Sequence, residues 1–266
     1  MSLLGKLVGA GFGYMLGGPI GAFLGAILGH QFDKGLQHTV FQSTADVERI
    51  QASFFTTLFS VMGHLAKADG RVSAQEIKAA QAIMQQMSLS EKQQGVAIEL
   101  FNKGKQTDFP LDAALTQFRQ ACHGQRNLIQ MFMEILLHAA YADGAMHPSE
   151  ERLLKHVAKK LGMSPFYFAQ LEKMVQAQQA FHQGRGAHRQ PAKPRADLLK
   201  EAYVILGVKA DASDAEVKKA YRRQMNQHHP DKLVAKGLPE EMIKMATEKT
   251  QEIQAAYETI QKVREK

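Results

Sequence analysis

The N-terminal part of the chain contains 23 consecutive residues, Leu7 to Gly29, without a charged side chain. Fourteen of them are apolar or aromatic, eight are glycine and one is Pro19. As a helix, this stretch would be roughly 35 Å long, which is enough to cross the hydrocarbon core of a membrane. A cleaved signal peptide usually has a shorter apolar core and ends in small residues, whereas this stretch ends in GAILGHQFDKG. We therefore predict a retained transmembrane helix at 7–29, preceded by a short N-terminus at 1–6.

Glycine recurs at every fourth position through this stretch. Because residues i and i+4 lie on the same face of a helix, these glycines would form a smooth groove that a second helix could approach closely. The residues concerned are Gly5, Gly9, Gly13, Gly17, Gly21, Gly25 and Gly29. We expect the helix to self-associate as a homodimer, although glycine is also simply common in membrane helices. Few charges flank the stretch, so charge bias does not determine its orientation.

The overall charge restricts the class of binding partner only in part. With 33 basic and 26 acidic side chains, the net charge of +7 suits an acidic protein, an anionic membrane surface or nucleic acid. Cys122 is the single cysteine, so no disulfide can form within the chain. It could be a reactive nucleophile, but only the neighbouring His123 offers activation, and we expect a structural cysteine.

Residues 45–179 follow a helical pattern and contain an internal repeat. The segment HLAKADGRVSAQEIKAAQAIMQQMSLS aligns with HAAYADGAMHPSEERLLKHVAKKLGMS at a constant offset of 74 residues. Such a repeat indicates two copies of one helix-turn-helix unit that pack together. In each copy an Ala-Asp-Gly turn, where glycine can take a left-handed conformation, separates two helices. Ser73 with Glu76 fits a capping box, and Pro148 with Glu150 fits the start of the corresponding helix.

Acidic residues near the two turns could also bind a divalent cation, because carboxylate oxygens are suitable ligands. Turn formation and helix capping already account for most of these positions, so we predict no metal site and no cofactor. The candidates for such a site are His64, Asp69, Glu76, His138, Asp143 and Glu150.

The duplicated ADG turns and the glutamates that follow them make this region resemble the TerB-like helical domains, first named from tellurite-resistance proteins. The resemblance implies an interaction or sensing module and does not by itself imply tellurite chemistry. A juxtamembrane segment at 30–44 precedes the region. Residues 180–196 follow it and contain two prolines, two glycines and many polar and basic residues, which predicts a flexible basic linker.

Residues 197–266 are again helical in pattern, in three pieces. The first, DLLKEAYVILGV, stops at Gly207, and a capping box of Ser213 and Glu216 starts the second. A third helix at roughly 240–263 should lie antiparallel to the second, with HHPDKLVAKGLP as their connection. Four cations share an exposed surface of the second helix. They suggest an acidic partner, although by themselves they fit an ordinary solvated basic face better. They are Lys218, Lys219, Arg222 and Arg223.

The connection contains the unusual run NQHHPDKLV. A zinc site would need more ligands than this part of the chain offers, and a catalytic triad would need a nucleophile and an oxyanion hole nearby. Pro230 has a fixed φ and restricts His229 to an extended backbone, which stiffens the connection and presents the imidazole and the Asp231 carboxylate outward. This arrangement favours display to a partner protein over catalysis.

The run AYVILGV…SDAEVKKAYRRQMNQHHPDK…TQEIQAAYETI resembles a J domain over about 65 residues. The resemblance implies that the triplet His229, Pro230 and Asp231 and the basic second helix bind a DnaK-type chaperone and stimulate its ATP hydrolysis. Lys232 would join the four cations of that helix in electrostatic contacts, while Tyr221 packs. The connection is longer than in a typical J domain, and Thr250 stands where a phenylalanine is usual.

With its three parts in this order, the whole chain resembles the membrane-anchored DnaJ-like co-chaperones of Gram-negative bacteria. The fold class we predict is all-α: one transmembrane helix, a duplicated TerB-like domain and a C-terminal J-domain hairpin. The resemblance implies a co-chaperone and not an enzyme, set in the inner membrane with its bulk in the cytoplasm. Its partners would be the chaperone, membrane lipid, a second copy and an unknown client, and no nucleic acid. The alternative is a membrane stress-sensing or signalling scaffold that acts through the TerB-like domain.

Overall fold

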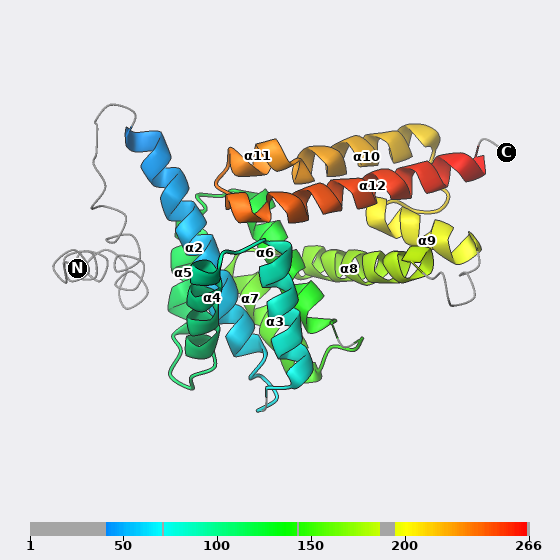
Figure 1. Ribbon diagram of the computed structural model, residues 1–266. Helices are drawn as coiled ribbons and strands as arrows, with labels where there is room; N and C mark the ends of the chain where they lie inside the picture. Colours follow the sequence, from blue (N-terminus) through cyan, green and yellow to red (C-terminus); the bar gives the residue numbers. More distant parts are fainter. Residues whose placement is uncertain (1–40, 71, 143, 187–194, 265–266) are drawn as a thin grey trace.

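The computed structural model describes residues 41–70, 72–142, 144–186 and 195–264 (Figure 1). Every regular element in these residues is a helix, which confirms the predicted all-α class. The predicted transmembrane segment, with its glycine repeat, lies outside the described residues, as does Asp143. Within the described part of the chain, no helix is both long and apolar enough to cross a membrane.

Seven helices form a central unit, and their bounds reproduce the sequence repeat. They are α2 (Phe41–Leu65), α3 (Ala74–Gln86), α4 (Glu91–Gly104), α5 (Leu111–Ala121), α6 (Arg126–Ala140), α7 (Pro148–Lys160) and α8 (Pro165–Gly186). Helices α7 and α8 begin 74 residues after α3 and α4 respectively, which is the offset of the repeat. The predicted duplication is therefore present in the fold.

The local signals at the two turns act as the sequence predicts. Gly70 and Gly144 have φ values of +95° and +100°, a left-handed conformation that glycine adopts without a steric penalty. Ser73 caps α3, with its hydroxyl accepting from the backbone N–H of Glu76. At the same place in the second copy, His147 caps α7, with Pro148 as the first helical residue. These caps satisfy backbone N–H groups that have no partner inside the helix.

The core of the central unit lies between α2, α5 and α6. Phe54 packs edge-on against Phe118 and Phe132, with ring centroids 5.6 Å apart in both pairs. Helix α6 lies deepest, because most of its residues are buried. Cys122 is fully buried at the end of α5, and this burial raises the pKa of its thiol to about 12. The thiol is therefore neutral and inaccessible, as expected of a structural cysteine.

Two glycines allow α2 and α4 to cross at very short range. A Cβ atom added to Gly63 would lie 1.9 Å from the carbonyl oxygen of Phe101, and one added to Gly104 would lie 1.8 Å from that of Ser60. Both contacts are with backbone atoms, which cannot rotate away. The crossing therefore requires glycine at both positions because there is no space for a side chain. The backbone conformation itself does not require glycine there.

The remaining helices form a C-terminal unit. They are α9 (Arg195–Leu206), α10 (Asp214–His228), the short α11 (Pro230–Val234) and α12 (Ile243–Arg264), with a 3-10 turn at Glu240–Met242 before α12. Helices α10 and α12 run antiparallel, as predicted (Figure 1). The predicted connection between them contains α11, so part of it is helical. The predicted linker is also partly helical, because α8 continues to Gly186 and α9 begins at Arg195.

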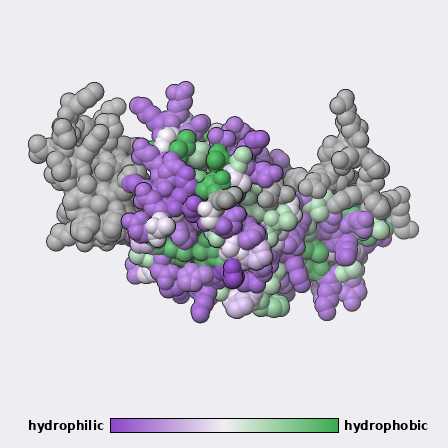
Figure 2. Space-filling model, turned by 90° about the horizontal axis from the view of Figure 1, so that it is seen from below, coloured by the Kyte–Doolittle hydropathy of each residue, from purple (hydrophilic) through white to green (hydrophobic). Residues whose placement is uncertain are grey.

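The C-terminal unit packs directly on the central unit. Helix α9 packs against both the end of α8 and α12 (Figure 1), and Lys249 of α12 donates to Gln178 of α8 at 2.7 Å. Phe181 of α8 is buried in one apolar cluster with residues of α9, α10 and α12. Leu233, Leu238 and Met242 are buried in the core cluster of the central unit. Figure 2 shows a face on which hydrophilic residues predominate and apolar residues form separate patches. The two units thus share buried apolar surface, which stabilises their association.

Candidate functional site

The triplet His229, Pro230 and Asp231 lies where α10 ends and α11 begins. His229 has φ −60° and ψ 123°, an extended backbone that ends α10, as the following proline requires. Pro230 is the first residue of α11, where its missing N–H group leaves no helical hydrogen bond unmade. The sequence therefore produces a sharp, stiff corner between two helices.

The carboxylate of the triplet is presented to solvent as predicted, whereas the imidazole is only half exposed and its Nδ1 atom is buried. The side chain of Asp231 is 90% exposed and that of His229 is 45% exposed. Nδ1 of His229 lies 4.0 Å from Oδ2 of Asp231, and it has no hydrogen-bond partner among the described residues. The imidazole is thus placed by packing and by the backbone, and not by polar contacts of its own ring.

The basic residues lie along α10, the helix that ends at the triplet. All four are exposed: Lys218, Lys219, Arg222 and Arg223. Lys232 of α11 is also exposed and contacts the side-chain oxygen of Asn226 on α10. On the packed side of α10, Tyr221 stacks on Tyr257 of α12 with ring centroids 4.3 Å apart, which confirms that Tyr221 packs. One helix therefore carries a packed face and a cationic face.

The two units meet at a buried polar cluster next to the triplet. Glu134 of α6 and Lys249 of α12 form an ion pair with an N–O distance of 2.7 Å, and both are almost fully buried. The amide nitrogen of Gln130 donates to Glu134 at 2.8 Å and lies 3.2 Å from Nε2 of His228. The cluster thus joins α6 to the end of α10 and to α12.

The pKa shifts in this cluster follow from burial and from the nearby charges. Burial would raise the pKa of Glu134, but the charge of Lys249 and the hydrogen bonds from Lys249 and Gln130 outweigh it and lower the pKa to about 2. Burial lowers the pKa of His228, and the carboxylate of Glu134 offsets only part of this effect. His228 is therefore neutral at pH 7, and its contact with Glu134 at 3.7 Å is not an ion pair.

Sequence analysis missed this cluster, although two signals point to it. Glu134 is the single charged residue in the apolar run LIQMFMEILL, and a buried charge normally has a partner. Lys249 lies three residues after Ala246 and four before Ile253, on the buried stripe of α12. Both positions therefore predict a buried charge, but the pattern does not show that the two charges meet.

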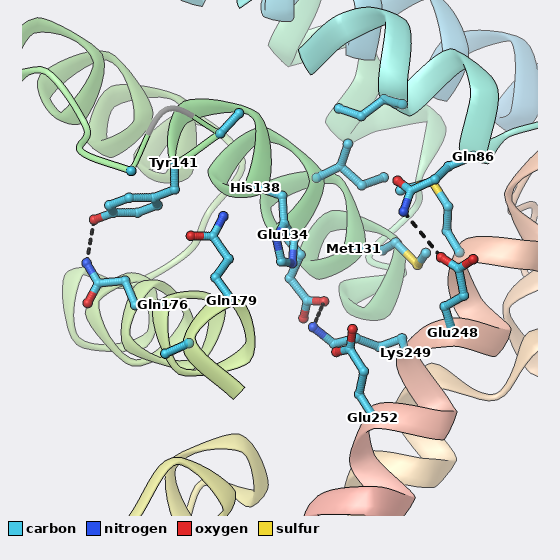
Figure 3. Close-up of a pocket in the computed structure, with 16 residues that line it drawn as sticks. Gln86, Met131, Glu134, His138, Tyr141, Gln176, Gln179, Glu248, Lys249 and Glu252 are labelled. Carbon is cyan, nitrogen blue, oxygen red and sulfur yellow. Dashed lines mark hydrogen bonds and ion pairs between the residues drawn. The ribbon is translucent and has the colours of Figure 1, made fainter. Parts of the chain in front are cut away.

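A cleft of about 790 Å³ opens between the two units beside this cluster (Figure 3). Its residues come from α3, α6, α8 and α12 and from the turn after α6, and they combine apolar side chains with amides and carboxylates. Glu134 and Lys249 line it, and Gln86 of α3 donates to Glu248 of α12 at 3.2 Å across it. The volume is within the range of pockets that hold small ligands or short peptide segments.

The structure brings together some of the residues considered as candidate cation ligands. Asp69, Glu76 and Glu150 line one small cavity of about 280 Å³ between the two turns. The carboxylates of Glu76 and Glu150 accept hydrogen bonds from the backbone N–H groups of Ser73 and His147, which is their capping role. Among the described residues, no group of three or more His, Cys, Asp or Glu side chains could hold a metal ion. His64 lies elsewhere, with Nδ1 3.1 Å from the carbonyl oxygen of Gly104, and His138 lines the cleft.

Three family models match the chain in the predicted order. The model of the co-chaperone DjlA transmembrane domain matches residues 1–39, that of the tellurite resistance protein TerB matches 56–173, and that of the DnaJ domain matches 201–266. No solved structure gives a significant match to the chain. The fold, the exposed triplet and these matches define the class of protein: a J-domain co-chaperone with a TerB-like middle domain and a membrane anchor.

Known relatives match over nearly the whole chain. Co-chaperone protein DjlA of Coxiella burnetii is 46% identical, with 99% of both chains covered. The DjlA proteins of Photobacterium profundum and Salmonella typhimurium are 45% and 43% identical, and the matches cover 97% and 98% of this chain and 98% and 97% of those proteins. The chain belongs to the DjlA family of co-chaperones. Each of these relatives is a co-chaperone by name.

Proposed function

We propose that this protein recruits a DnaK-type chaperone to the membrane and stimulates its ATP hydrolysis. The observation that carries the proposal is the exposed corner between α10 and α11, where Asp231 is 90% exposed beside a row of exposed cations. The proposed binding residues are the triplet His229, Pro230 and Asp231 together with Lys218, Lys219, Arg222, Arg223 and Lys232.

The two parts of this surface have different physical roles. Exposed cations on α10 attract an acidic partner over a distance, so they set the rate of encounter and its salt dependence. The triplet is a rigid group at the end of a packed helix, and it acts by contacting one state of the chaperone more favourably than another. The cations therefore set the protein concentration that gives half of the maximal stimulation of ATP hydrolysis. The triplet sets the maximal rate of hydrolysis itself.

The partner also determines the proposed location. ATP and a DnaK-type chaperone are cytoplasmic in bacteria, so residues 30–266 face the cytoplasm and 1–6 lie outside a single inner-membrane span. We propose that this span, at 7–29, contacts lipid and pairs with a second copy through its glycine repeat. Pairing would place two chaperone-binding surfaces at one point of the membrane. The cleft between the two units is our candidate for the contact with a client.

The test is single-turnover ATP hydrolysis by a DnaK-type chaperone, with the full chain reconstituted in lipid vesicles. We expect the wild-type chain to accelerate hydrolysis and His229→Gln to lose most of the acceleration. Asp211→Asn is a matched control, because Asp211 is an exposed acid of the same unit outside the surface. Equal acceleration by wild-type protein and His229→Gln would exclude the triplet as the trigger.

The scaffold alternative makes a different prediction in cells. If the TerB-like domain acts by itself as a stress sensor, a His229→Gln chain keeps its cellular phenotype after it has lost chaperone stimulation. If the co-chaperone proposal is correct, the phenotype and the stimulation are lost together.

A further inference from the structure

Helix α6 of the central unit holds the end of α10 immediately before the triplet. The side-chain amide of Asn127 donates to the carbonyl oxygen of Gln227 at 3.2 Å, and Nε2 of Gln130 lies 3.2 Å from Nε2 of His228. Gln227 and His228 are the last two residues before His229. The last turn of a helix has carbonyl groups without partners inside the helix, and here a different domain supplies a partner for one of them.

These contacts continue into a chain of buried partners. Gln130 accepts from the hydroxyl of Tyr167 at 2.6 Å and donates to Glu134. Glu134 in turn binds Lys249, whose ammonium group also donates to Gln178 of α8 at 2.7 Å. Buried charges and amides are costly without partners, so each member of this network restricts the positions of its neighbours.

The triplet itself has few polar constraints. Asp231 is 90% exposed, and Nδ1 of His229 has no hydrogen-bond partner among the described residues. Pro230 fixes the backbone between them. The direction in which the triplet points is therefore set by its two neighbouring segments: the end of α10, which α6 holds, and α11, whose Leu233 is buried in the core cluster.

We propose that Asn127, Gln130 and Glu134 are positioning residues for the chaperone-activating triplet, with Lys249 as their anchor in the J domain. The TerB-like domain is then part of the activating site and not only a separate module on the same chain. This inference rests on the proposed function. It predicts that loosening the network lowers the maximal rate of stimulated hydrolysis. The half-saturating protein concentration should stay the same, because the cations of α10 set it.

The interface between the units offers a matched control. Gln86 of α3 donates to Glu248 of α12 at 3.2 Å across the cleft (Figure 3). Like the contact between Gln130 and His228, this hydrogen bond joins the two units, but it is exposed to solvent. Replacing Gln86 by alanine removes a contact between the units without touching the end of α10. It therefore separates general weakening of the interface from loss of positioning.

The experiment compares the full-length wild type, Asn127→Ala, Glu134→Gln and Gln86→Ala in lipid vesicles. Single-turnover hydrolysis by the chaperone is measured against protein concentration, and amide hydrogen exchange is measured at 231–234. We expect Asn127→Ala to lower the maximal rate about fivefold, the effect of one lost hydrogen bond, and to speed exchange. Glu134→Gln leaves the buried ammonium group of Lys249 without its counter-ion and should have a larger effect on both measurements. Gln86→Ala should match the wild type in both measurements. Asn127 is only partly buried, so its variant remains informative if Glu134→Gln unfolds.

Two results would overturn the positioning role. One is a maximal rate and an exchange rate in Asn127→Ala equal to those of the wild type, and the other is an equal loss in Gln86→Ala, which would indicate general weakening. If the wild-type chain itself fails to stimulate hydrolysis, the proposed function fails. The exchange rates at 231–234 then still decide whether α6 positions the triplet.

Discussion

The close crossing of α2 and α4 makes a quantitative prediction about stability. In Gly63→Ala the new Cβ would lie 1.9 Å from the carbonyl oxygen of Phe101, whereas real Cβ contacts are essentially never below 3.0 Å. The helices must therefore separate by about 1 Å, and the packing on both sides of α2 is disturbed. Overpacking of this kind costs about 1–3 kcal/mol, and we expect the upper part of this range because the contact is with backbone. The higher helix propensity of alanine returns at most about 1 kcal/mol.

The net expectation is a loss of about 2 kcal/mol, which lowers Tm by about 4–8 °C for a domain of this size. Gly95→Ala is the matched control, because Gly95 is an exposed residue within α4 with no atom within 4 Å of the added Cβ. There the same substitution should raise stability by about 0.5–1 kcal/mol. Thermal unfolding of the full chain in mild detergent, followed by circular dichroism, measures both. A Gly63→Ala variant as stable as the wild type would show that the helices do not cross at this distance.

Three further predictions concern other parts of the chain. Arg264 donates to Asp214 and to the backbone oxygen of Ala212, both at 2.6 Å. Arg264→Ala should therefore lower the free energy of unfolding, measured by urea titration, by about 1–2 kcal/mol. Arg264→Lys should have an intermediate effect. Burial lowers the pKa of His228 below 6.5, so the unfolded chain binds more protons and stability falls as the pH drops from 6.5 through the folded-state pKa. His228→Asn should reduce the loss of stability between pH 7 and pH 5, and an unchanged loss would assign it to other groups. In the predicted membrane helix, Gly17→Leu with Gly21→Leu should abolish chemical crosslinking of two copies, and unchanged crosslinking would exclude the glycine groove as the contact.

Local features of the fold could be predicted because their causes are local. The capping residue Ser73 and the turn residue Gly70 act within a few positions of themselves, so the sequence alone is enough to find them. The internal repeat also helped, because the first Ala-Asp-Gly turn allowed the corresponding turn in the second copy to be predicted. The J-domain triplet was likewise found from its own residues, since Pro230 restricts its neighbour in any context.

The association of the two units could not be predicted, because it depends on contacts that are distant in sequence. Glu134 and Lys249 are separated by more than 100 residues and meet only when α12 lies across α6. The basic composition after 179 indicated a linker, yet α8 continues to Gly186 because Phe181 is buried against the C-terminal unit. Composition reports only local preferences, and at the end of α8 tertiary packing outweighed the local preference for a linker.

The most direct test of the account is the concentration dependence of stimulated ATP hydrolysis at low and high salt, for wild type and Asp231→Asn. If the cations of α10 steer encounter and the triplet triggers hydrolysis, added salt raises the half-saturating concentration of both proteins, because exposed charges are screened. Asp231→Asn lowers only the maximal rate. A wild-type half-saturating concentration that does not change with salt, or an Asp231→Asn variant with the full maximal rate, would contradict the account.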